Sequence, residues 1–266
     1  MNGIFEKIPK EEVAYDKEMF LMNFKNKTAL VTGASVGIGR AVALKLAEYG
    51  ANLVLFDINY EKLEEVKKEI GCYTENVLIY NCDVSDEGKV YECVSDAQKK
   101  FNRIDILINN AALWRDRGRF TDVSSELWRK YLDINVMGVV YATKAVLPQM
   151  IENQYGRIIN VASVAGVYGN ANMVHYSATK GAIISMTKGL AKEVTDKGIL
   201  VNAVSPGSVS KSFDPDIHSY QPSELSFMGR TGTDAENANL ICFLASDEAS
   251  YISGQNIQID GCRKKM

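Results

Sequence analysis

One tyrosine in the sequence has a lysine four residues after it, in the segment YSATK that begins at Tyr176 and ends at Lys180. In a helix, positions i and i+4 lie on one face, so the phenol and the ammonium would be neighbours. A tyrosine with its usual pKa of about 10 is a poor base at neutral pH. A nearby cation lowers that pKa because it favours the phenolate. The pair could therefore transfer a proton, although the same spacing is more often only an exposed helix face.

Three other polar residues stand where they could join this pair. Ser163 and Asn110 come just after short apolar runs that read as strands, and Asn135 lies in a long predicted helix. Ligands of open α/β sheets bind beyond the carboxyl ends of the strands. We therefore expect these side chains to converge on one site with Tyr176.

A glycine-rich segment, TGASVGIG at residues 32–39, stands between a predicted strand and a predicted helix. Glycines allow a tight turn and a close approach to a pyrophosphate, and the helix start supplies free N–H groups and the positive end of a dipole. The strand before it and the helix after it make the motif more specific than its glycines alone. The expected cofactor contacts here are Gly33, Ser35, Val36, Gly37, Ile38 and Gly39.

Two acidic residues follow the next two predicted strands. Asp57 could accept hydrogen bonds from both adenosine ribose hydroxyls and would repel a 2′-phosphate. Neither Val36 nor Ile58 supplies a cation for such a phosphate, so NAD is expected rather than NADP. Asp83 could accept from the adenine amino group while the N–H of Val84 bonds the ring. Either acid could instead be a helix cap.

These residues must be positioned by a regular alternation of short apolar runs and longer amphipathic stretches. The runs show little polar alternation, as expected of parallel strands buried on both faces. Predicted strands are residues 28–32, 52–56, 77–81, 104–109, 156–161, 199–204 and 256–260, and predicted helices are 38–49, 59–70, 86–100, 125–152, 175–197 and 234–246. The pattern predicts an α/β, single-domain Rossmann fold: a doubly wound seven-stranded parallel sheet with helices on both faces. Residues 1–24 read as an N-terminal extension and 25–266 as the nucleotide-binding domain.

Composition narrows the functional classes. The 266 residues carry a formal net charge of −3, so nothing general attracts nucleic acid or an anionic membrane. The five cysteines form no CxxC pair and there are two histidines, so neither a disulfide framework nor a metal site is expected. No apolar run is long enough to span a bilayer, and the first residues lack a signal peptide's apolar stretch. A cytoplasmic location is expected.

Taken together, the motifs resemble those of the short-chain dehydrogenase/reductase family of the classical type, over nearly the whole chain. The matching residues are TGASVGIG at 32–39, Asp57, Asp83, NNAA at 109–112, Asn135, Ser163, YSATK at 176–180 and the Pro-Gly pair at 206–207. The resemblance implies an NAD(H)-dependent oxidoreductase that interconverts an alcohol and a carbonyl. It also implies a homotetramer.

The resemblance implies a role for each polar residue of the reaction end, which is the part of the site formed by Asn135, Ser163, Tyr176 and Lys180. Tyr176 would donate the proton in reduction and accept it in oxidation, and Ser163 would hydrogen-bond the substrate oxygen. Lys180 would bond the nicotinamide ribose and lower the pKa of Tyr176. Asn135 would hold a water in a proton relay. Further cofactor contacts would come from Asn110, Tyr176, Lys180, Pro206 and Val209.

The substrate is less clearly indicated. Expected contacts are Trp114, Ser163, Tyr168 and Tyr176, and residues 208–228 would cover the pocket. The aromatic residues favour an apolar secondary alcohol such as a hydroxysteroid, with a 3-oxoacyl thioester or a sugar or polyol as alternatives. A nucleotide-binding regulator without turnover is an alternative of another class, because a fold alone does not prove activity. The complete Asn-Ser-Tyr-Lys set favours an enzyme.

Overall fold

The structure is a computed structural model that describes residues 22–210 and 216–264. Nearly all of the predicted N-terminal extension, residues 1–24, lies outside the described residues, as do five residues, 211–215, of the segment expected to cover the pocket. The division of the chain into an extension and one domain stays a prediction.

Seven parallel strands form one sheet in the order β3-β2-β1-β4-β5-β6-β7. This confirms the predicted Rossmann-like fold. The strand order reverses between β1 and β4, the kind of switch point where open α/β sheets bind ligands. The strands are β1 (Thr28–Thr32), β2 (Asn52–Asp57), β3 (Val77–Asn81), β4 (Ile106–Asn109), β5 (Gly156–Val161), β6 (Ile199–Pro206) and β7 (Asn256–Ile259).

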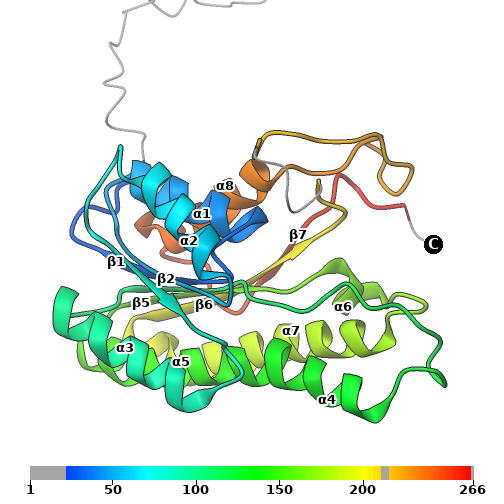
Figure 1. Cartoon of the computed structure of the whole chain (residues 1–266), viewed down its shortest axis with the longest axis horizontal. Helices are drawn as coiled ribbons and strands as arrows, with labels where there is room; N and C mark the ends of the chain where they lie inside the picture. Colours follow the sequence, from blue (N-terminus) through cyan, green and yellow to red (C-terminus); the bar gives the residue numbers. More distant parts are fainter. Residues whose placement is uncertain (1–21, 211–215, 265–266) are drawn as a thin grey trace, which may run out of the picture.

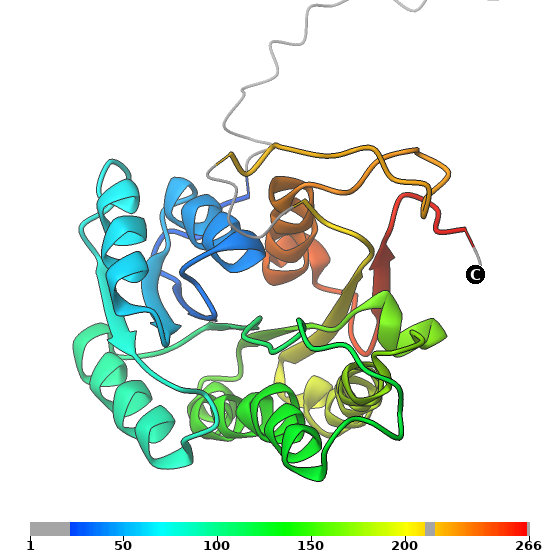
Figure 2. The same cartoon turned by 45° about the vertical axis from the view of Figure 1, so that its right-hand side comes forward.

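Helices cover both faces of the sheet (Figures 1 and 2). One face carries α1 (Gly37–Glu48), α2 (Tyr60–Ile70) and α8 (Asp234–Ala245), and the other carries α3 (Glu87–Phe101), α4 (Ser125–Leu132), α5 (Gly138–Glu152) and α7 (Val174–Val194). A cluster of buried apolar side chains fills the space on each side. The central strands are buried throughout, which explains their continuous apolar runs.

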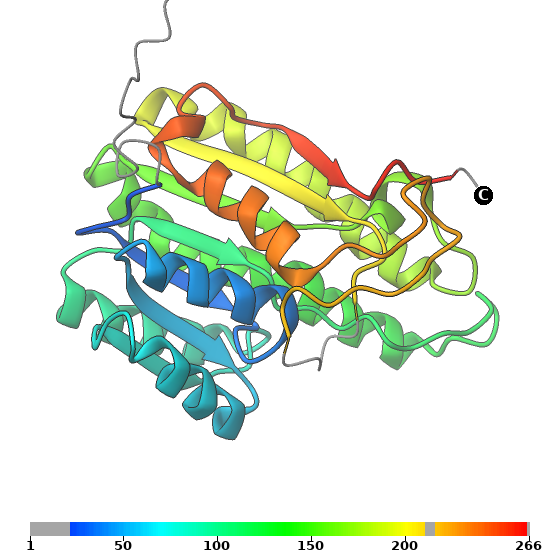
Figure 3. The same cartoon turned by 90° about the horizontal axis from the view of Figure 1, so that it is seen from above.

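The register of the strands brings their carboxyl ends to one edge. Thr32 pairs with Phe56, so the glycine loop and Asp57 emerge side by side. Asn109 pairs with Asn160 in the same way. Figure 3 shows that the segment before α8 and the tail after β7 lie side by side beyond this edge.

The structure differs from the predicted elements in two ways that matter for the site. The predicted helix over 125–152 is interrupted by a π-helical turn, η2 (Asp133–Met137), between α4 and α5. A short helix that was not predicted, α6 (Val164–Tyr168), follows β5. Its five residues are too few for a periodic pattern to identify. The π-helical turn contains Asn135, and α6 begins directly after Ser163, so both features position polar residues of the reaction end.

The helical run Ser125–Glu152 is long and apolar enough, by length and composition alone, to cross a membrane. Its apolar side chains have a place in the fold. Ala142, Val146 and Met150 are fully buried and belong to the core cluster beneath the sheet. Part of the apolar surface of this run thus packs in the core.

Candidate active site

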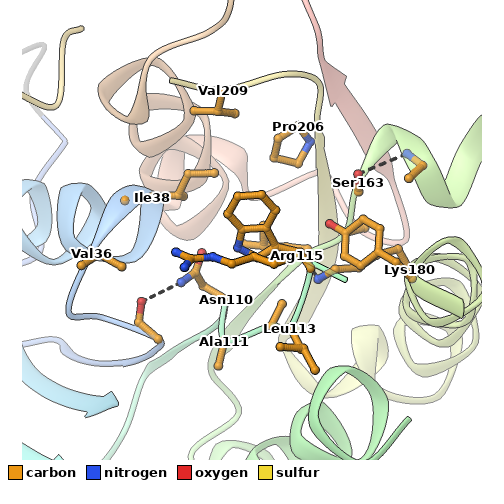
Figure 4. A pocket seen from close by; sticks show the side chains of 18 of the residues that line it. Val36, Ile38, Asn110, Ala111, Leu113, Arg115, Ser163, Lys180, Pro206 and Val209 are labelled. Carbon is orange, nitrogen blue, oxygen red and sulfur yellow. Dashed lines mark hydrogen bonds between the residues drawn. The ribbon is translucent and has the colours of Figure 1, made fainter. Parts of the chain in front are cut away.

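A cavity of about 930 Å³ runs along the carboxyl edge of the sheet. Figure 4 shows Val36 and Ile38 on one side of it and Ser163 and Lys180 on the other. The predicted site residues that line it are Gly33, Ser35, Val36, Gly37, Ile38, Asp57, Asp83, Val84, Asn110, Trp114, Ser163, Tyr176, Lys180, Pro206 and Val209. Three predicted site residues are not among the lining residues: Gly39, Asn135 and Tyr168.

The glycine loop is built so that only glycine fits at two of its positions. Gly33 has φ +63°, and a side-chain carbon on Gly39 would stand 2.1 Å from the carbonyl oxygen of Gly33. Gly39 thus supports the loop from beneath rather than lining the cavity. Helix α1 begins at Gly37 with no side-chain cap and no acidic residue in its first turn. Its free N–H groups and positive dipole end suit a pyrophosphate.

Asp57 stands at the end of β2 and has two backbone partners. One carboxylate oxygen accepts from the N–H of Ser35 at 3.0 Å, and the other accepts from the N–H of Asn59 at 2.9 Å. Each oxygen keeps a further lone pair, so the carboxylate can also accept from ribose hydroxyls. The open N–H groups at the start of α1 and this carboxylate fit the pyrophosphate and ribose of a dinucleotide.

Thr32 is a site residue that the sequence did not reveal. Its hydroxyl oxygen accepts from the N–H groups of Asn110 at 3.0 Å and Ala111 at 3.1 Å. The carboxamide of Asn110 in turn donates to the carbonyls of Thr32 and Gly33. These bonds join the end of β4 to the glycine loop. Asn110 therefore shapes the loop, whether or not it also touches the cofactor.

Ser163 is the N-cap of α6. Its hydroxyl oxygen accepts from the N–H of Ala165 at 3.1 Å (Figure 4), and its hydroxyl proton is not used in that bond. A hydrogen bond with the Ser163 side chain lowers the pKa of Tyr176, but burial raises it more. The phenol therefore favours its protonated form in this structure.

Lys180 lies one helical turn from Tyr176 and is 3% exposed. Its ammonium donates to the carbonyl of Val161 at 2.6 Å and stands 5.9 Å from the centre of the Tyr176 ring. Burial lowers the pKa of Lys180 to about 8. The role of Lys180 in lowering the pKa of Tyr176 stays a prediction, since burial and the Ser163 hydrogen bond are the two effects that act on that pKa in this structure.

Asn135 is fully buried in the π-helical turn η2, and its carboxamide makes three hydrogen bonds. Its oxygen accepts from the N–H of Leu113, and its nitrogen donates to the carbonyl of Leu113 and to the hydroxyl of Thr179. Both N–H donors are thus in use. A water held by Asn135, as the family resemblance implies, would have to donate to the second lone pair of its side-chain oxygen or to its backbone carbonyl.

The aromatic residues around the reaction end divide into two groups. Trp114 lines the cavity and is 44% exposed. Tyr168 points away from the cavity lining, because its hydroxyl donates to the side chain of Gln258 at 2.6 Å. His175 is 1% exposed and packs edge-on against Tyr131, with ring centres 4.3 Å apart.

Among the described residues, no cluster of His, Cys, Asp and Glu could hold a metal ion.

A parallel sheet with a glycine loop at its switch point, and a serine, tyrosine and lysine at the other end of one cavity, define a Rossmann-fold oxidoreductase. The family model for short chain dehydrogenases matches residues 27–220. The chain belongs to the short-chain dehydrogenase/reductase family.

Individual relatives cover almost all of this chain. A 3-oxoacyl-(acyl-carrier-protein) reductase FabG of Thermotoga maritima is 39% identical over 90% of this chain and 98% of its own length. One from Staphylococcus epidermidis is 36% identical over 89% and 98%. Among solved structures, NAD+-bound xylitol dehydrogenase has a TM-score of 0.83 and 36% identity, covering 90% of this chain and 99% of that one. Levodione reductase has a TM-score of 0.82 and 33% identity, covering 90% and 98%.

Proposed function

We propose that this oxidoreductase uses NAD(H) to interconvert a secondary alcohol and a ketone. The observation that carries the proposal is that one cavity is lined by Ser163, Tyr176 and Lys180 and also by Asp57. The glycine loop lines the same cavity. This is the arrangement that a hydride transfer coupled to a proton transfer needs.

A bound nicotinamide cofactor supplies the hydride in reduction and accepts it in oxidation. Tyr176 donates its phenolic proton to the substrate oxygen as the ketone becomes an alcohol, and takes the proton back in the reverse direction. The free proton of Ser163 is donated to the same oxygen and stabilises its developing negative charge. Lys180 stabilises the phenolate that Tyr176 becomes after the transfer.

The preference for NAD over NADP rests on Asp57. Its carboxylate faces the adenosine end of the cavity, flanked by the apolar Val36 and Ile58. A 2′-phosphate placed there would meet a negative charge. Lys62 also lines this end and would favour the phosphate, so the ratio of kcat/KM for NADH and NADPH is the decisive measurement. A ratio in favour of NADPH would contradict this part of the proposal.

Three substrate classes have support. The exposed aromatic ring of Trp114 suits an apolar ring or chain, as in a hydroxysteroid or related secondary alcohol. The identity to 3-oxoacyl-(acyl-carrier-protein) reductases supports a 3-oxoacyl thioester, and the likeness to xylitol dehydrogenase supports a polyol. A cytoplasmic homotetramer completes the proposal. Gel filtration with light scattering tests the assembly.

The experiment that tests the proposed activity follows NADH absorbance with the purified full-length chain. The panel contains steroid ketones, 3-oxoacyl thioesters, simple cyclic ketones and ketoses, with the matching alcohols and NAD+ for the reverse reaction. Oxidation of NADH that depends on one class of ketone is the expected result. Tight binding of NADH with no turnover across the panel would instead favour a nucleotide-binding regulator.

A further inference from the structure

Two arginines that line the cavity have no hydrogen-bond or ion-pair partner for their side chains among the described residues, whereas most of the other arginines do. Arg117 and Arg263 are both lining residues. Within residues 22–210 and 216–264, neither guanidinium makes a hydrogen bond or an ion pair. Carboxylates neutralise other arginines of the chain: Arg40, Arg103, Arg129, Arg157 and Arg230. The cavity thus contains guanidinium groups whose donors are unused.

Hydrogen bonds hold the backbone on either side of Arg117, although its guanidinium has no hydrogen-bond partner among the described residues. The N–H of Asp116 donates to the hydroxyl of Tyr131 at 3.1 Å, and that hydroxyl donates to the Asp116 carboxylate at 3.1 Å. The N–H of Gly118 donates to the carbonyl of Asn172 at 2.9 Å. Tyr131 is fully buried, so this anchor is part of the core. The backbone of Arg117 is therefore anchored at a place from which its side chain lines the cavity.

Arg263 is held in a similar way on the opposite segment. The residue before it, Cys262, accepts at its carbonyl from the N–H of Phe227 at 2.9 Å. The residue after it, Lys264, donates its N–H to the carbonyl of Leu225 at 3.0 Å. Figure 3 shows the tail after β7 beside the segment that precedes α8. Two separate elements thus each present one unpaired guanidinium to the same cavity.

Within the described parts of the chain, the acidic residues that line the cavity form no ion pair with Arg117 or Arg263. Asp57 and Asp83 follow β2 and β3, at the adenosine end. The third, Asp234, is 2% exposed at the start of α8. A guanidinium that loses water on substrate binding needs a charged partner. Its forked donors match a carboxylate or a phosphate group.

We propose that the substrate is an anionic ketone or alcohol whose carboxylate or phosphate group is bound by Arg117 and Arg263. The inference rests on the proposed alcohol–ketone activity and names the substrate class for it. Trp114, Met173 and Leu225 line the same cavity and contact the apolar part of the substrate. The reacting carbonyl lies at Tyr176 and the charged group at the opposite end of the molecule.

Matched substrate pairs test the charge directly. One set is the oxo acids from 4-oxopentanoate to 8-oxononanoate, each compared with its methyl ester, so that only the charge changes. A second pair is dihydroxyacetone phosphate and dihydroxyacetone, which reports whether phosphate is the accepted anion. We expect kcat/KM to favour the anion by about tenfold or more in at least one pair, since a hydrogen bond to a charged group changes rates by roughly this factor. Ratios of one or below in every pair would overturn the inference.

Variants assign that preference to residues. Arg117→Gln and Arg263→Gln should each lower kcat/KM for the preferred anion about tenfold or more, mostly through KM, and leave the neutral partner unchanged. Arg119→Gln is the matched control, because Arg119 lies on the same loop, is exposed and does not line the cavity. It should retain the full preference. Equal effects of all three variants would contradict a specific site.

The two proposals fail in distinguishable ways. Turnover of neutral ketones without any preference for anions would leave the oxidoreductase function standing and overturn the anion site. If no ketone is turned over, tryptophan fluorescence of the enzyme–NADH complex is titrated with 8-oxononanoate and its methyl ester, since Trp114 lines the cavity. Tighter binding of the acid, lost in Arg117→Gln, supports the site; equal or absent binding overturns it.

Discussion

The carboxamide of Asn135 pairs with the backbone of Leu113 as a neighbouring strand would. It accepts from the Leu113 N–H at 2.7 Å and donates to the Leu113 carbonyl at 2.9 Å. Asn135 lies in the π-helical turn η2, and Leu113 lies beside Trp114 in the loop that follows β4. The side chain of a residue in the π-helical turn thus holds the loop whose residues Leu113 and Trp114 line the cavity.

Asn135→Ala should weaken both the fold and the site. It leaves two backbone groups of Leu113 without partners, and each such group costs about 1–3 kcal/mol when it stays buried. We expect a loss of roughly 2–4 kcal/mol in the free energy of unfolding and at least about a tenfold fall in kcat. Asn153→Ala is the control, since its carboxamide is exposed and bonds only its own helix. Urea unfolding and steady-state kinetics of both variants decide the matter.

Tyr176→Phe removes one hydroxyl oxygen and should lower kcat by about 100- to 10,000-fold, the usual contribution of a positioned acid–base group. The affinity for NADH, measured by fluorescence titration, should stay within about a factor of two. Tyr168→Phe removes the same atom outside the cavity and should stay near wild-type activity. If Tyr168→Phe fell as far as Tyr176→Phe, Tyr168 would be a substrate contact after all.

The buried Lys180 makes stability depend on pH. Its pKa in the fold is about 8, against a usual value of 10.5. Between these values the unfolded chain keeps a proton that the folded chain has released, so the contribution of Lys180 to stability rises with pH across this window. Relative to Lys180→Met, the wild type should gain about 3 kcal/mol from pH 8 to pH 10.5. Parallel curves of unfolding free energy against pH for the two proteins would contradict this.

Gly166 sets the distance between α6 and α7. A side-chain carbon there would lie 2.5 Å from the carbonyl carbon of Lys180, so Gly166→Ala must push the helices apart. Ser163, at the start of α6, should then move away from Tyr176, and kcat should fall about tenfold or more while NADH affinity is retained. In Gly189→Ala the new carbon meets nothing within 4 Å. That variant should keep full activity and gain about 0.5–1 kcal/mol of stability.

The sequence predicted the sheet well because its strands are short apolar runs, and the central ones are buried on both faces. β1, β3 and β5 begin and end where the apolar runs do. The glycine loop could also be placed, because a strand, three glycines and a helix occur in one short segment. These features depend on residues that are close together in the sequence, so a local sequence pattern is enough to predict them.

Features that depend on distant contacts could not be predicted in the same way. The π-helical turn contains Asn135, whose side chain bonds a partner 22 residues away along the chain. The pKa direction of Tyr176 depends on burial, and the lysine one turn away in the sequence suggested the opposite. Arg117 and Arg263 are far apart in the chain, and only the folded structure shows that both line one cavity.

Asp57 has consequences for how this enzyme could change over evolutionary time. The carboxylate, which we propose binds the ribose, also holds the glycine loop through the N–H of Ser35. Replacing it to admit a phosphorylated cofactor would also release the loop that cradles the pyrophosphate. A substitution at Asp57 that changed the cofactor preference would therefore also disturb this loop. An enzyme built this way should retain its redox partner while its substrate specificity diversifies freely.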